Sequence, residues 1–268
     1  MSTLSSTLPE TLREVRKARR MSQLELSMRV GVSQRHMSFV ESGRSSPSRE
    51  LLLAWLQELD APLAVRNAAL LQAGYAPAYN AAPLGDPSLA QANEAMSQLL
   101  QAHDPMPALL LDADWNLLRM NNGAGWLAVT LMPWVASVPP GTPMNVLDLL
   151  THPEGFARDM VNLDEVGPTL LSHLRAEASA HPPLTPRVEA FAEMLHTRLG
   201  AGKMPAGWSS PAAPVLTTRF ATVHGELAFF SMFTTFGTPQ NITLASLRVE
   251  HMFAADDATR AVIRSHVA

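Results

Sequence analysis

Residues 22–48 read SQLELSMRVGVSQRHMSFVESGRSSPS, and this stretch decides the fold of the front of the chain. Ser22 is a good helix N-cap, and Glu25, three residues later, completes a capping box before an apolar run. Gly31 then ends this helix, and Ser33 caps a second, shorter one with polar side chains on its outer face. The stretch therefore predicts two short helices joined by a glycine-containing turn.

Further helical patterns flank this pair. Residues 9–20 begin at a first-turn proline and space apolar residues three apart, which predicts an amphipathic helix. Residues 49–59 carry apolar side chains at three-and-four spacing, and residues 62–73 form a fifth helical run that Gly74 ends. A helix-turn-helix needs such bracing helices, because its second helix must present side chains to the major groove of DNA. The sequence thus predicts an all-α head of five helices.

The two parts of the chain differ in charge. Residues 1–80 contain ten Lys and Arg against seven Asp and Glu, a net charge of +3, whereas residues 81–268 contain ten against seventeen, a net charge of −7. A basic head on a larger acidic body indicates a polyanionic partner at one end of the molecule. A solvated, charged helix face would give the same asymmetry, so charge alone leaves both interpretations open.

Composition excludes several classes of protein. The 268 residues include no cysteine, which removes disulfides, thiol catalysis and cysteine-based metal sites. No apolar run is long enough to span a membrane, and the first residues lack the pattern of a secretion signal, so we expect a cytoplasmic protein with no membrane partner. The nine histidines form no zinc-binding motif and no phosphate-binding loop occurs. We therefore expect no catalytic residues, no metal and no cofactor; an enzyme fused to the head would need a cleft of convergent polar groups.

A change in composition marks the domain boundary. Residues 76–87, APAYNAAPLGDP, are rich in proline and small residues, which is typical of a linker. We therefore assign residues 1–80 to the helical head and residues 81–268 to a second domain.

The second domain begins with a helical pattern at residues 88–102. Two apolar runs around Asp112–Asp114 then predict a β-hairpin. Residues 145–200 predict several helices. Prolines are expected to break these helices at Pro153, Pro168, Pro182, Pro183 and Pro186.

Strand patterns return near the end of the chain. Residues 214–236 predict two strands across a turn at His224 and Gly225. Residues 242–253 predict a third strand, although Leu244 and Leu247 also suit a helix. With strands first and last and helices between, the second domain is predicted to be α+β with a mainly antiparallel sheet.

These segments carry a family resemblance. Residues 22–48 resemble the XRE-type helix-turn-helix of lambdoid repressors. The segments LDAPLAVRNAALLQAGYAPAY, HDPMPALLLDADWNLLRMNN, FFSMFTTFGTP and VEHMFAADDATR resemble bacterial regulators with a MmyB-like ligand-binding domain of PAS-like fold. The resemblance covers nearly the whole chain. It implies a transcription regulator that binds double-stranded operator DNA as a homodimer and senses a small apolar or fatty-acid-like ligand.

The chain departs from the family pattern at three positions. Leu163, Met106 and Ala254 stand where Trp, Tyr and Pro are usual. These differences alter packing or the shape of a pocket, so the identity of the ligand is the property least safely carried over.

The resemblance implies that the start of the second helix of the pair reads bases. Glutamine pairs with adenine and arginine with guanine, each good contact giving about 1–3 kcal/mol of discrimination. Gln23 is expected to hold a phosphate together with nearby backbone N–H groups. The candidate DNA-binding residues are Gln23, Ser33, Gln34, Arg35, His36, Ser38, Arg44 and Ser45.

Alternatives remain for some residues of the head. His36 could serve as a helix cap or pack in the core instead of contacting DNA. Arg44 could do no more than pair with Glu41. Met37, Phe39 and Val40 are expected in the core rather than at DNA.

The second domain is rich in large, pliable side chains that could line an apolar pocket. A ligand carboxylate would also need a cationic or amide clamp. The candidate ligand-binding residues are Met120, Trp126, Phe156, Phe230, Met232 and Phe233 for the pocket, and Arg119, Asn122, Arg158, Asn162 and Arg219 for the clamp. Each of the aromatic and methionine residues could instead be plain core. The alternative function is a DNA-binding protein whose second domain serves only for dimerisation or recruitment of a partner.

Overall fold

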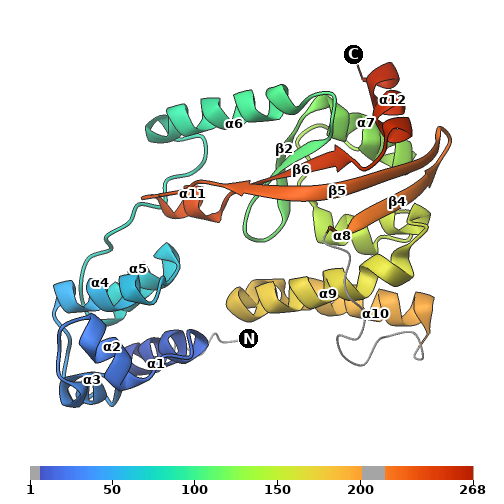
Figure 1. Cartoon of the computed structure of the whole chain (residues 1–268). Coiled ribbons are helices and arrows are strands. Elements are labelled where there is room, and N and C mark those ends of the chain that lie inside the picture. The colour runs from blue at the N-terminus through green and yellow to red at the C-terminus, as the bar shows by residue number, and fades with distance from the viewer. Residues whose placement is uncertain (1–6, 201–214, 268) are drawn as a thin grey trace. The chain divides into compact units, whose positions relative to one another are not determined.

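The computed structural model describes residues 7–200 and 215–267 (Figure 1). These residues pack as two compact units. The first contains residues 7–88 and 237–245, and the second contains the described residues of 89–236 and 246–267. The domain boundary after residue 80 stays a prediction.

Residues 7–88 form five α-helices, as the sequence predicts. Their bounds are α1 Leu8–Ala18, α2 Gln23–Arg29, α3 Gln34–Glu41, α4 Arg49–Glu58 and α5 Leu63–Gln72. The hydroxyls of Ser22 and Ser33 each accept the backbone N–H three residues on at 3.1 Å, which fixes the starts of α2 and α3. Gly31 has φ +72°, a left-handed conformation that ends α2 at little steric cost. Local sequence signals therefore set the helix-turn-helix geometry.

A later segment of the chain packs with this first unit. The backbone N–H of Ile242 donates to the carbonyl of Asn80 at 2.8 Å, and the hydroxyl of Thr243 donates to the carbonyl of Ala82 at 2.7 Å. Helix α11 (Ile242–Ser246) begins here, because the side chain of Asn241 accepts N–H groups at its start. The chain thus leaves the second unit and returns to it.

In the described part of the second unit, six strands form one antiparallel sheet in the order β3-β2-β1-β6-β5-β4. This confirms the predicted α+β class with an antiparallel sheet. The strands are β1 Ala108–Leu111, β2 Asn116–Met120, β3 Met144–Asn145, β4 Thr217–Thr222, β5 Gly225–Thr235 and β6 Arg248–Ala254. The longer helices are α6 Ala90–His103, α7 Asn122–Leu131, α8 Val146–Thr151, α9 Leu163–Ala180, α10 Thr185–Leu199 and α12 Asp257–His266.

Both predicted hairpins are present. β1 pairs with β2, and the carboxylate of Asp112 accepts the N–H groups of Asp114 and Asn116 at 2.9 Å, which closes the turn. β4 pairs with β5 across the predicted turn at His224 and Gly225. Pro214, the first residue of that prediction, lies outside the described residues.

Two expectations for the second half were wrong in part. Helix α9 continues through Pro168, which lies inside the helix and costs it one backbone hydrogen-bond donor. Residues 242–253 are not a single strand: the part around Leu244 is helix α11, as the alternative interpretation allowed, and β6 begins only at Arg248. Among the described helices, none combines the length and the apolar character that a membrane span requires.

Candidate functional site

Helix α3 presents the predicted base-reading face. Gln34, Arg35 and Arg44 are exposed, while His36, Ser38 and Ser45 are half-buried. The hydroxyl of Ser33 is already engaged as the cap of α3, so its contribution to the helix is structural. The exposed polar side chains at the start of α3 have the chemistry that base recognition needs.

Phe39 lies differently from the sequence expectation. Met37 and Val40 are buried in the core, as expected, but Phe39 is half-buried and lies outside that cluster. Its ring is flanked by the guanidinium groups of Arg35 and Arg44, whose central carbons lie 5.3 Å and 5.9 Å from the ring centroid. Successive helical residues are about 100° apart, so the residue between two core positions faces elsewhere. Phe39 holds two cationic side chains together on the surface of α3.

Glu41 joins three helices beneath this surface. The Nε and Nη2 groups of Arg16 on α1 donate to its two carboxylate oxygens at 2.6 Å and 2.8 Å, and Nε2 of Gln23 on α2 donates at 2.7 Å. Burial would raise the pKa of Glu41, but these hydrogen bonds and the positive charges of Arg16 and Arg13 outweigh it and hold the pKa below its ordinary value. Gln23, a predicted phosphate ligand, therefore has one amide N–H committed to Glu41. Arg16, not Arg44, is the ionic partner of Glu41.

The second unit contains a cavity of about 730 Å³. Its wall is built from α7, α8 and α9 and from strands of the sheet. Most of the lining side chains are apolar, among them Leu109, Leu117, Leu127, Leu131, Val166, Leu170, Phe220 and Phe229. The volume lies within the range of about 300–1,000 Å³ that is usual for small-molecule sites.

Polar side chains gather in one part of this wall. Arg248, Glu250 and Met252 alternate along β6 and line the cavity together with Ser231 on β5 and Glu177 on α9. Nη1 of Arg248 donates to Oε1 of Glu177 at 2.6 Å, and Oγ of Ser231 donates to Oε1 of Glu250 at 2.6 Å. Burial raises the pKa of Glu250, against the opposing effects of Ser231 and the charge of Arg248.

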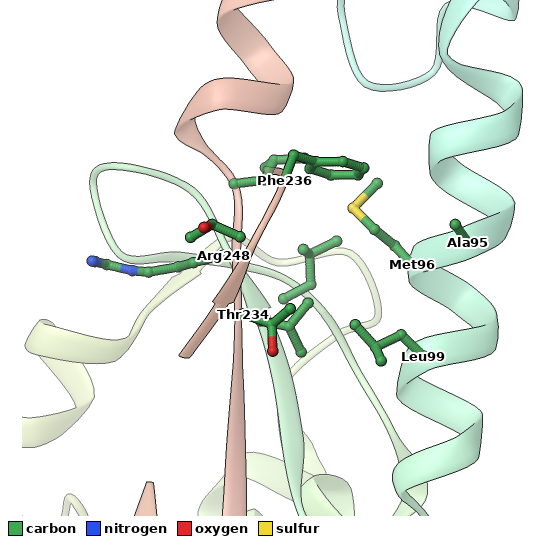
Figure 2. Close-up of a pocket in the computed structure, with 10 residues that line it drawn as sticks. Ala95, Met96, Leu99, Thr234, Phe236 and Arg248 are labelled. Atoms are coloured by element: carbon green, nitrogen blue, oxygen red, sulfur yellow. The ribbon is translucent and has the colours of Figure 1, made fainter. Parts of the chain in front are cut away.

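The opposite face of the sheet carries a smaller cavity of about 100 Å³ beneath α6. Figure 2 shows Met96 and Leu99 of α6 pointing toward the strands. The guanidinium of Arg248 points to the other side, away from α6. The charged end of Arg248 therefore belongs to the large cavity and not to the small one.

The structure brings some of the predicted ligand residues together. Met120, Phe156, Phe230, Met232 and Phe233 line the large cavity. Trp126 does not, and its ring instead packs beside His224 and His266, with ring centroids 5.5 Å and 5.6 Å away.

The residues predicted as a carboxylate clamp lie outside the cavity wall and have other partners. Arg119 donates to the side chains of Asn93 and Ser97, Asn122 donates to Asp104, and Arg158 pairs with Asp159. Asn162 bonds the backbone of Thr217 and of Arg219, whose own guanidinium lies 3.7 Å from Glu165 and from Glu226. These side chains bind other groups of the protein and so stabilise the fold.

Sequence reasoning missed the polar residues of the wall. The available signal was the alternation of Arg248 and Glu250 with apolar residues in an otherwise buried strand. That signal was ambiguous because residues 242–253 combine a helix and a strand.

Family comparisons agree with this architecture. Residues 12–65 match the family model described as helix-turn-helix, and residues 92–265 match that of the MmyB-like transcription regulator ligand binding domain. The chain belongs to the family of the MmyB-like ligand binding domain. It is thus a DNA-binding transcription regulator with a ligand-binding domain, and the large cavity lies within the region that the family model covers. Both families are domains of regulators rather than of enzymes. A search of curated proteins found no match.

Proposed function

We propose that this regulator reads a specific operator through α3 and senses a fatty-acid-like ligand in the 730 Å³ cavity. The cavity is the observation that carries the proposal. Its wall is mainly apolar, with a few polar groups in one part, which suits a molecule with a long apolar body and a polar end. Methionine side chains in the wall, such as Met120, Met232 and Met252, adapt to ligands of different length.

The DNA part of the proposal assigns base reading to Gln34, Arg35 and Ser38. The exposed side chains of Gln34 and Arg35 suit adenine and guanine, and the flanking Arg44 suits the phosphate backbone. We further propose a homodimer, in which two heads meet half-sites about 34–36 Å apart on the operator. A ligand that changes the spacing of the heads would need a coupling free energy of about 1–3 kcal/mol.

Native mass spectrometry of the purified protein tests the ligand and the dimer together. We expect a dimer mass and, after denaturation, release of a small lipid-like molecule. Operator binding with and without that molecule then gives the direction of control.

A dimer that carries nothing and takes up no medium- or long-chain fatty acid would overturn the ligand proposal. The second domain would then serve for dimerisation or partner recruitment. The base-reading proposal is tested separately: Arg35→Ala should relax sequence preference at fixed salt, and unchanged preference would remove Arg35 as a reader.

A further inference from the structure

We propose that Arg248 anchors an anionic head group, so the cavity selects carboxylates over neutral molecules of the same length. The proposal rests on the ligand function proposed above for the same cavity. Arg248 takes the role that the sequence suggested for the clamp residues, which do not line the cavity.

The hydrogen bonding of Arg248 is incomplete. Its Nη1 group donates to Glu177, but in the part of the chain that the structure describes, its Nε and Nη2 groups are buried without a hydrogen-bond partner. Buried donors without partners are rare in folded proteins, so each of them calls for an explanation, such as a functional role. Arg248 thus offers two donors that the described residues do not satisfy.

These two donors form the edge of a guanidinium that matches a carboxylate. Arg16 shows the arrangement within the same chain: its Nε and Nη2 groups bind the two oxygens of Glu41 at 2.6 Å and 2.8 Å. Such bidentate pairs are stronger and more selective than single hydrogen bonds. The corresponding edge of Arg248 is therefore suited to a ligand carboxylate.

Aromatic rings hold the guanidinium in place. Its central carbon lies 4.1 Å from the ring centroid of Trp115 and 5.5 Å from that of Phe233. Trp115 is buried and its Nε1 donates to Glu177 at 3.3 Å, whereas Phe233 is 49% exposed. The guanidinium is therefore stacked between a buried ring and a more exposed one that also lines the cavity.

The charges that line this part of the cavity are compatible with an anion. Glu177 pairs with Arg248, and the other titratable groups among the described lining residues are Glu250 and His173. Burial favours the neutral form of Glu250, since it raises the pKa of this carboxyl. The raised pKa of Glu250 therefore works against the repulsion that its charged form would exert on a bound carboxylate.

The test compares decanoate with 1-decanol, which share the apolar body and differ in the head group. Both are titrated calorimetrically into the full chain after co-purified lipid has been removed on a hydrophobic resin. The wild type should bind decanoate about 10- to 100-fold more tightly than decanol, as expected for hydrogen bonds to a charged group. Arg248→Met should abolish this preference and leave decanol binding unchanged.

Arg219→Met is the matched control, because it removes an arginine of the same unit that does not line the cavity. It should retain the preference for decanoate. Arg248→Lys gives a second measurement if Arg248→Met does not fold: it keeps the charge but lacks the planar fork, so only part of the preference should remain.

Each outcome decides between the two proposals. Equal binding of both probes by the wild type, or an unchanged preference in the Arg248 variants, would overturn the anchor and leave the ligand function standing. Failure of both probes to bind the wild type would overturn the ligand function and the anchor with it.

Discussion

Among single residues, Glu41 links the helices that carry DNA recognition. Its buried carboxylate is bound from α1 by Arg16 and from α2 by Gln23, while Glu41 itself is part of α3. One charge thus fixes the turn between α2 and α3 against the bracing helix. A buried ion pair of this kind is costly to break from one side, because the remaining charge stays out of water.

We expect Glu41→Gln to reduce the free energy of unfolding of the first unit by about 3–5 kcal/mol at neutral pH. The folded pKa of Glu41 is lowered, so its stabilisation is present above the pKa of an unfolded glutamate and is lost as the pH falls through the folded value. Hydrogen exchange of α1 to α3 in urea, at neutral and acid pH, measures both effects. The difference from wild type should shrink in acid; an equal difference at both pH values would contradict the assignment.

Glu25→Gln is the control for this substitution. Glu25 pairs with Arg29 on the surface, where both side chains are about half exposed. Exposed pairs contribute about 0–1 kcal/mol, so the stability of this variant should stay close to that of wild type.

Phe39 acts on DNA recognition through its two arginine neighbours. Removing the ring in Phe39→Ala should free Arg35 and Arg44 from their cation–π contacts, each of which contributes about 0.5–1 kcal/mol at an exposed site. We expect operator affinity at fixed salt to fall about 5- to 30-fold, the equivalent of two such contacts. Thermal unfolding of the first unit should change little, because Phe39 lies outside the core.

Phe39→Leu separates the role of the ring from that of an apolar surface residue. It should weaken operator binding nearly as much as Phe39→Ala. Full retention of affinity in either variant would show that the stacked arginines do not depend on the ring.

For the helices and strands, α7 shows how a single glycine sets the position of a helix. A Cβ atom at Gly123 would collide with the backbone carbonyls of Pro105 and Met106, whereas one at Gly125 would meet nothing within 4 Å. The N–H of Gly123 also donates to the carboxylate of Asp104 at 3.0 Å. The start of α7 is therefore packed directly against the chain that leads into β1.

Gly123→Ala and Gly125→Ala form a matched pair within α7. We expect Gly123→Ala to destabilise the second unit by about 1–3 kcal/mol, because the backbone must move to admit the methyl group. Gly125→Ala should stabilise it by up to about 1 kcal/mol through helix propensity. Urea unfolding followed by hydrogen exchange of α7 gives both values, and a neutral Gly123→Ala would show that the backbone yields easily.

Features that depend on residues close together in the sequence could be predicted, whereas features that depend on distant residues could not. Ser22 and Ser33 cap helices through bonds to residues three positions away, so a local pattern predicts them. Arg248 depends on long-range geometry: it pairs across the sheet with Leu111 and Thr235 and bonds Glu177. No local pattern contains those neighbours, and the arginines that the sequence suggested as a clamp, such as Arg119, bind other partners.

At the scale of the whole molecule, the proposed function requires that ligand and operator affect each other. If decanoate changes operator affinity by some factor, the operator must change decanoate affinity by the same factor, because the coupling free energy is shared. We expect a factor of about 5–150. Decanoate titrations with and without a duplex obtained by selection from a random library measure it, and a decanoate affinity that the duplex leaves unchanged would show that the two sites are not coupled.

The return of residues 237–245 to the first unit changes how the protein can be divided. β5 and β6 are neighbours in the sheet, yet the loop that joins them is held by Asn80 and Ala82 of the other unit. A protease cut after residue 88 would leave the halves associated through that embedded loop. The N-terminal fragment would lack residues 237–245 of its own unit, and the C-terminal fragment would carry them. The unit that binds DNA is therefore tied to the strands that carry Phe233 and Arg248 at a second place.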